Sequence, residues 1–118
     1  MPLSFTLHES AAYLHCETSG PATLADMRAG VDLARSLAAS RGLRRILVDM
    51  RQVQHALPFT EHLQLGAYIA ETLTGVDKVA SVVEAGRMVG VSAKAARKLG
   101  MQLRTFDDIH EAQAWLQS

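Results

Sequence analysis

The segment Arg44-Arg45-Ile46-Leu47-Val48-Asp49 decides the fold of this chain. Its apolar residues stand side by side without polar alternation, which is typical of a strand covered on both faces. Long helical patterns precede and follow the segment, so we expect a central strand within a β-α-β-α-β unit. Asp49 would then lie at the carboxyl end of that strand, on the side of an open α/β sheet where ligands and partners usually bind.

The composition describes a small chain without a strong electrostatic bias. A length of 118 residues suits one domain with one core, over residues 1–118. Twelve basic residues balance twelve acidic ones, so no overall field attracts nucleic acid or an anionic membrane. Cys16 has no second cysteine to pair with, the first residues do not resemble a signal peptide, and no apolar run approaches the roughly 20 residues of a membrane-spanning helix. We therefore expect a cytoplasmic protein without stable membrane insertion.

The rest of the chain predicts four further strands and four helices. Alternating apolar and polar residues over 3–17 predict a hairpin with one buried face, which Thr18–Pro21 would break. Thr23 followed by Asp26 predicts the start of a helix that Gly42 ends. The remaining elements are, in order, a loop over 50–57, a helix over 59–73, a strand over 79–83, a helix over 88–99 ended by Gly100, a strand over 101–106, and a final helix capped by Asp107 or Asp108. The predicted order is β-β-α-β-α-β-α-β-α, an α/β fold with a mixed, mostly parallel five-stranded sheet.

The helix expected over 59–73 is apolar over more of its circumference than a surface helix needs. One stripe comprises Phe59, Leu63, Gly66, Ala70 and Leu73, and a second flank carries Leu65 and Ile69. Each leucine or isoleucine left exposed would forfeit roughly 1.5–3 kcal/mol of burial. We therefore expect core packing, a homodimer contact or a ligand to cover Leu57, Phe59, Leu65 and Ile69.

Three features together resemble a known family. They are the strand Ile46–Asp49, the loop that runs from it into a helix, and the terminal Phe106-Asp107-Asp108 followed by the helical segment 111–116. In these patterns of strand, cap and helix, nearly the whole chain resembles the SpoIIAA-like proteins. These are small relatives of the STAS domains, whose founding member antagonises an anti-sigma factor. The resemblance implies a STAS-like fold and a non-catalytic regulatory module that binds another protein or itself.

The resemblance also locates a regulatory position. Anti-sigma-factor antagonists carry an Asp-Ser-Ser/Thr-Gly turn at the start of the helix after the central strand, and a partner kinase phosphorylates its first serine. Counting forward from Asp49, this turn falls on Leu57-Pro58-Phe59-Thr60, which places Pro58 at the acceptor position. Proline has no hydroxyl, so phosphorylation there is excluded. Thr60 is either a displaced acceptor or a residue that satisfies a backbone amide in the first helical turn.

Two interpretations follow. Either the chain binds another protein or itself through the loop Asp49–Thr60 and the helix over 59–73, with Asp49, Arg51 and His55 among the contacts, or it carries or senses a small apolar ligand. The second interpretation rests on a further resemblance in fold, that of SpoIIAA-like proteins of this length to the CRAL-TRIO lipid carriers. Those carriers enclose an apolar ligand between a sheet and mobile helices, which here would place the ligand beneath the helix over 59–73.

Catalytic and metal motifs are not found in the sequence. The histidines show neither His-Glu-x-x-His nor Cys-x-x-Cys spacing, and we predict no metal and no cofactor. No Gly-x-Ser-x-Gly turn or phosphate-binding glycine loop occurs. An acid–base site could form if Asp49, Arg51, His55, His62 and Glu84 converged, but Asp49 is more simply explained by a pair with Arg51. We therefore expect no enzyme.

A run of basic residues without acidic ones extends from residue 86 to residue 106 and includes Arg104. Lys94, Arg97 and Lys98 lie within one helical turn, so they form a basic face that could meet an acidic partner or lipid headgroups, or simply be solvated. Because no aromatic residues are interleaved, a platform for nucleic acid is not expected.

Overall fold

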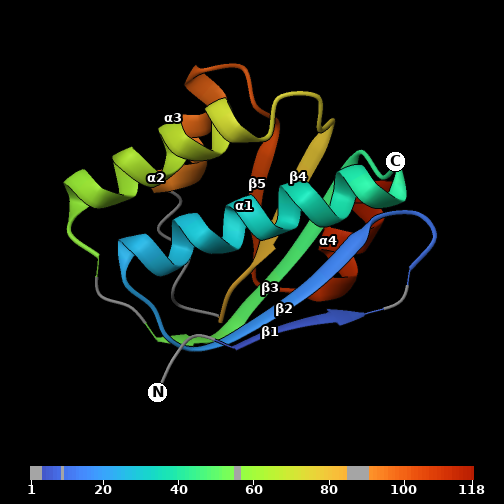
Figure 1. Cartoon of the computed structure of the whole chain (residues 1–118), viewed down its shortest axis with the longest axis horizontal. Helices are drawn as coiled ribbons and strands as arrows, with labels where there is room; N and C mark the ends of the chain where they lie inside the picture. Colours follow the sequence, from blue (N-terminus) through green and yellow to red (C-terminus); the bar gives the residue numbers. More distant parts are fainter. Residues whose placement is uncertain (1–3, 9, 55–56, 85–90) are drawn as a thin grey trace.

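The computed structural model describes residues 4–8, 10–54, 57–84 and 91–118, and Figure 1 shows them as one sheet with flanking helices. The strands are β1 (Ser4–His8), β2 (Leu14–Pro21), β3 (Arg45–Gln54), β4 (Lys78–Val82) and β5 (Leu103–Phe106), and the helices are α1 (Leu24–Arg41), α2 (Phe59–Thr72), α3 (Val91–Lys98) and α4 (Ile109–Gln117). The strand order is β1-β2-β3-β4-β5, with β1 antiparallel to β2 and the other neighbours parallel. The predicted element order and sheet type are confirmed.

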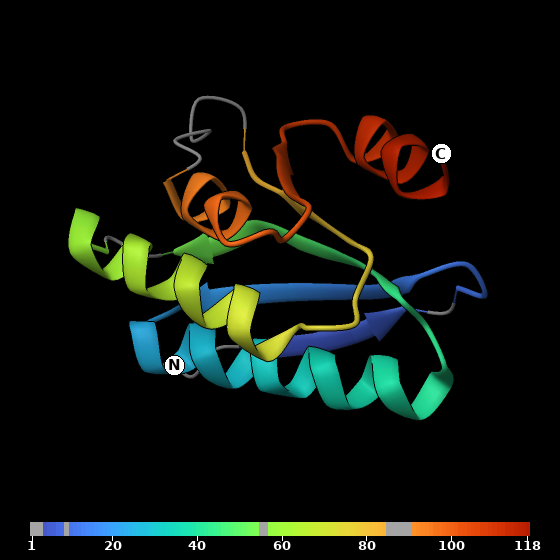
Figure 2. The same ribbon diagram turned by 90° about the horizontal axis from the view of Figure 1, so that it is seen from above.

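The sheet has a separate hydrophobic core on each face. Ile46 of β3 packs on one face with Ala34 and Ala38 of α1 and Ala96 of α3. Leu47, the next residue, packs on the other face with α4. Figure 2 shows α4 on the opposite side of the sheet from α1 and α2. Both Ile46 and Leu47 are fully buried, so the prediction of a strand covered on both faces is confirmed.

Two strands are longer than predicted. We predict a break at Thr18–Pro21 and the end of the central strand at Asp49, but β2 continues to Pro21 and β3 to Gln54. The two strands pair with each other in this region, up to Pro21 beside Gln54, with a register shift between Glu17 and Ser19. Hydrogen bonds to a distant strand thus override the turn preference of the local sequence.

This extension changes the position of Asp49. The residue lies inside β3 rather than at its end, opposite Val82, the last residue of β4. Asp49 therefore marks the level at which β4 stops and β3 continues beside β2.

The predicted helix ends are confirmed in α1 and α4. Thr23 Oγ1 accepts a hydrogen bond from the Asp26 amide at 3.2 Å, and the Asp26 carboxylate accepts one from the Thr23 amide at 2.9 Å. Gly42, with φ of 65°, closes α1 in the left-handed conformation that favours glycine. Asp108 Oδ1 accepts from the His110 amide at 2.8 Å and so caps α4.

The last strand is shorter than predicted, and the third helix can be compared only at its end. α3 is described from Val91 to Lys98, one residue short of the predicted end, and the predicted start at residues 88–90 lies outside the described residues. β5 begins at Leu103 rather than at residue 101, because the Met101 amide donates to the Ala96 carbonyl at 3.1 Å and completes the end of α3. Among the described residues, no helix is both long and apolar enough to cross a membrane.

Candidate functional site

The Asp49 carboxylate and the Arg51 guanidinium form a forked ion pair on β3. Arg51 Nη2 lies 2.6 Å from Asp49 Oδ2, and Arg51 Nε lies 2.9 Å from Asp49 Oδ1. The Arg51 backbone amide also donates to Oδ1, at 3.2 Å. The two residues are two positions apart on a strand, so their side chains lie on the same face of the sheet. The predicted pairing of these two residues is thus found.

This pair keeps Asp49 ionised. Burial by itself would raise the pKa of Asp49, whose side chain is 7% exposed, but hydrogen bonds from Arg51 and its positive charge outweigh burial and lower that pKa. A carboxylate with a lowered pKa, both of whose oxygens accept from a permanent cation, is a poor general base. The arrangement stabilises β3 and gives no support to acid–base catalysis by Asp49.

The same face carries a strip of polar residues, which we call the polar strip: His8, His15, Glu17, Asp49 and Arg51. His8 Nε2 and Glu17 Oε1 are 2.8 Å apart, and the rings of His8 and His15 lie 4.7 Å apart. Burial, followed by the charge of His8, lowers the pKa of His15. α4 packs against β3, β4 and β5 on this face, whereas His8, His15 and Glu17 come from β1 and β2.

Of the two arrangements considered for Asp49, the structure shows the pair with Arg51. The alternative acid–base site would also have needed His55, which lies outside the described residues. Glu17, which the sequence did not place near Asp49, is the register partner of Asp49 in β2. The alternation over 3–17 predicted a hairpin with one buried face, and in β2 Leu14 and Cys16 are buried whereas His15 and Glu17 are half-buried. That β2 lies directly beside β3 could not be inferred, because the sequence does not specify the strand order.

The first turn of α2 exposes apolar side chains. Pro58 is the N-cap residue, and its carbonyl accepts from the amides of Glu61 and His62 at 3.0 and 3.1 Å. Phe59 is 64% exposed and Leu63 is 40% exposed. These two residues are four positions apart, which places them on the same side of the helix. We call Phe59 and Leu63 the α2 patch.

The burial of α2 changes along the helix. Of the predicted stripe, Phe59 and Leu63 are exposed, whereas Gly66 and Leu73 are buried and Ala70 packs against the core. On the second flank, Leu65 is buried and Ile69 packs against the core. The cause is visible in Figures 1 and 2, where the first turns of α2 project beyond the sheet. Core packing thus covers Leu65 and Ile69, and the uncovered apolar surface lies at the beginning of the helix.

The other predicted site residues are dispersed. Leu57 is half-buried and Thr60 is exposed, both beside the α2 patch in the sequence. Lys94, Arg97 and Lys98 are exposed on α3. Within the described ranges, no three His, Cys, Asp or Glu side chains are grouped so that they could hold a metal ion.

The comparisons with known proteins identify the family. The SpoIIAA-like family model matches residues 13–117. A crystal structure of an uncharacterised protein with a SpoIIAA-like fold from Shewanella loihica is 20% identical, with a TM-score of 0.60, covering 98% of this chain and 93% of that one. An anti-sigma factor antagonist from Mycobacterium paratuberculosis is 11% identical, with a TM-score of 0.68, covering 98% of this chain and 95% of that one. No curated protein matches the chain. Because the family model spans most of its length, the chain belongs to the SpoIIAA-like family.

Proposed function

We propose that this chain is a non-catalytic regulatory module that binds a protein partner through the α2 patch. The observation that carries the proposal is the exposure of Phe59 and Leu63 at the start of α2. Full burial of an exposed side chain of this size contributes roughly 1.5–3 kcal/mol, so covering Phe59 would contribute part of this and covering the less exposed Leu63 a smaller part. A pair of apolar anchors one turn apart is a common basis of protein recognition by a helix. One structural neighbour is named as an anti-sigma factor antagonist, a protein whose target is another protein.

The proposed module lacks the phosphorylation switch at the usual position. Pro58 stands at the N-cap of α2, where the resemblance places the acceptor serine, and it has no hydroxyl. Thr60, two residues later, is exposed but belongs to the first turn of the helix. We therefore expect phosphopeptide mapping of protein from growing cells to show no stoichiometric phosphate at Thr60. Stoichiometric modification there would refute a module without this switch.

The packing beneath α2 argues against the alternative of an apolar ligand at that place. Leu65 and Gly66 are buried there, and Ile69 packs against the core, so a ligand at this place would have to displace existing side chains. The α2 patch instead lies on the outside of the helix, where a second macromolecule can reach it. The outward position of the α2 patch therefore favours a protein partner over a ligand beneath α2. That partner is a different protein or, as the simplest alternative, a second copy of this chain.

The proposal is tested by co-purification of tagged variants expressed at native level. Leu63→Glu places a charge in the α2 patch, and Leu33→Glu is the matched control because Leu33 is 42% exposed on α1. We expect one stoichiometric partner to accompany the unchanged protein and Leu33→Glu but not Leu63→Glu. Equal recovery of the same proteins with both variants would refute the proposal. Native mass spectrometry of the purified protein adds a second criterion, because a retained lipid-sized mass would favour the ligand carrier instead.

A further inference from the structure

β5 is an edge strand whose outer side is unpaired in the described part of the chain. It is the last strand of the sheet and pairs with β4 alone. The Val79 amide donates to the Gln102 carbonyl at 2.9 Å, and the Val83 amide donates to the Phe106 carbonyl at 2.8 Å. In a parallel ladder, every second residue of a strand directs its backbone amide and carbonyl to the same neighbouring strand. The backbone groups of Gln102, Arg104 and Phe106 therefore face β4. The Thr105 amide and carbonyl therefore point away from the sheet.

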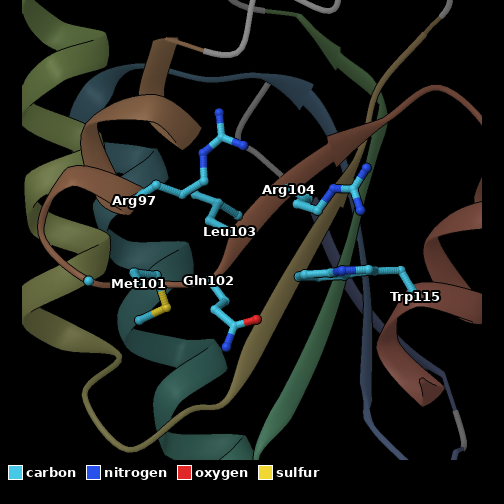
Figure 3. Close-up of a pocket in the computed structure, with 7 residues that line it drawn as sticks. Arg97, Met101, Gln102, Leu103, Arg104 and Trp115 are labelled. Atoms are coloured by element: carbon cyan, nitrogen blue, oxygen red, sulfur yellow. The ribbon is translucent and has the colours of Figure 1, made fainter.

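A pocket of about 310 Å³ lies along this edge. Figure 3 shows its lining: Arg97 comes from α3, Trp115 from α4, and Met101, Gln102 and Arg104 from the segment that ends α3 and enters β5. The pocket reaches both faces of the sheet, because Leu103 belongs to the core beneath α3 whereas Arg104 lies on the face of α4, beside Trp115. A molecule in it would thus contact the strand edge together with side chains above and below.

The pocket carries positive charge that no carboxylate of the described residues balances. Arg104 lies over the rings of Phe106 and Trp115, at 5.1 and 5.6 Å from their centroids. Neither Arg97 nor Arg104 forms an ion pair with a described residue. Lys94 and Lys98 add two exposed cations on the same helix as Arg97. The complementary occupant is therefore acidic.

We propose that the free edge of β5 binds an extended acidic peptide segment of a partner protein as an additional strand. The partner backbone would pair with the outward amide and carbonyl of Thr105, which supplies affinity, and its alternating side chains would reach Arg104 on one face and Arg97 on the other. A symmetric pair of β5 strands from two copies of this chain would bring the two Arg104 guanidinium groups near each other, which disfavours self-association at this edge. The surface is distinct from the α2 patch and does not rest on it.

The test uses the full chain and a blocked seven-residue peptide that alternates glutamate and valine. Hydrogen exchange followed by NMR should show the Thr105 amide exchanging at least about ten-fold more slowly when the peptide is saturating, because that amide becomes hydrogen-bonded. Trp115 is the one tryptophan of the chain, so its single indole N–H signal should shift in the same titration.

Two controls separate strand addition from attraction by charge. A peptide with N-methyl groups on its β5-facing amides keeps its charge but cannot form the ladder, and it should bind at least about ten-fold more weakly. Arg104→Gln should weaken binding of the unmodified peptide by a similar factor, whereas Arg35→Gln, an exposed arginine on α1, should leave it unchanged.

The proposal is overturned by any of three results. These are no binding at millimolar peptide, equal binding of a peptide with lysine in place of glutamate, or binding that leaves exchange at Thr105 unchanged. The third result would indicate a simple anion site at Arg97 and Arg104 rather than an added strand.

Discussion

The Asp49–Arg51 pair shows how one side chain determines the charge state of another. The Asp49 carboxylate is nearly buried, yet Arg51 is 41% exposed and supplies the charge from the solvent side. Burial and pairing therefore oppose each other at a single carboxyl group, and pairing prevails. The acid is thereby fixed as a structural group in the middle of β3. Loss of the Asp49–Arg51 pair should therefore lower the free energy of unfolding before it affects the binding of a partner.

Removing the arginine tests this description. Arg51→Met leaves the buried carboxylate without its partner, and we expect the free energy of unfolding to fall by roughly 3 kcal/mol at pH 7. Arg44→Met is the control, because the Arg44–Asp77 pair is exposed on both sides, at 68% and 48%, and should cost less than about 1 kcal/mol. Urea denaturation of both variants measures the difference. Equal losses would show that burial of Asp49 does not set the strength of the pair.

The same pair predicts a dependence on pH. The pKa of Asp49 is lower in the folded state than in the unfolded state, where it is about 4. The pair therefore contributes its full stabilisation at a pH above the pKa of the unfolded state. This contribution is lost as the pH falls through the lower pKa of the folded state. The stability difference between the unchanged protein and Arg51→Met should therefore be full at pH 7 and should shrink in acid. A difference that is constant from neutral pH to about pH 3 would contradict the assigned charge state.

Cys16 offers a third prediction at the scale of a residue. The thiol is fully buried in β2, and burial raises its pKa to about 12. The thiolate is the reactive form, so a thiol reagent at pH 8 should not modify the folded protein except through opening of the structure. Labelling with iodoacetamide, followed by mass spectrometry, should track the unfolded fraction in urea. Rapid labelling of the native protein would show that Cys16 is accessible.

At the scale of elements, α2 divides into an overhanging beginning and a packed remainder. Leu65 is buried and Leu63 is 40% exposed, although the two are only two positions apart. The sequence indicated that the helix has more apolar surface than one face can bury, which is correct. It could not indicate which side meets the sheet, because that depends on where α2 starts relative to the edge of the sheet. The beginning of α2 at Phe59 agrees with the predicted helix, and Pro58 just before it is the N-cap residue.

Truncation at the two leucines measures this division. Leu65→Ala should lower the free energy of unfolding by about 2–5 kcal/mol, since it leaves a cavity in a packed core. Leu63→Ala removes a half-exposed side chain, and we expect a loss of less than about 1 kcal/mol. Both values come from chemical denaturation under identical conditions. A larger loss for Leu63→Ala would place that residue in the core and would remove the α2 patch.

At the scale of the whole molecule, the sequence predicted local features and missed those that depend on distant contacts. The buried strand at Ile46–Val48, the caps at Thr23 and Asp108 and the end of α1 at Gly42 follow from neighbouring residues. The continuation of β2 through Thr18–Pro21 depends on a parallel partner that is remote in the sequence. For the same reason, the pairing of Asp49 with Arg51 could be predicted from the sequence, whereas the position of Glu17 beside them could not.

The sheet and α2 should also differ in local stability. Ile46 and Leu47 are buried in a strand paired on both sides, so opening there requires nearly global unfolding. The amides at the start of α2 belong to turns that project beyond the sheet and should open locally. Native-state hydrogen exchange should therefore show early exchange from residue 62 to residue 64 and the latest exchange from Ile46 to Val48. Uniform protection of the two segments would contradict this order.

The central claim is that the α2 patch is the surface through which this module meets its partner. Site-specific photo-cross-linking in cells tests it most directly, with a benzophenone amino acid in place of Phe59 or, as the control, in place of Leu33 on α1. We expect a discrete adduct with one protein from position 59 and none from position 33, and the adduct at 59 should disappear when Leu63→Glu is added. Identical adducts from both positions, or none from position 59, would contradict the claim.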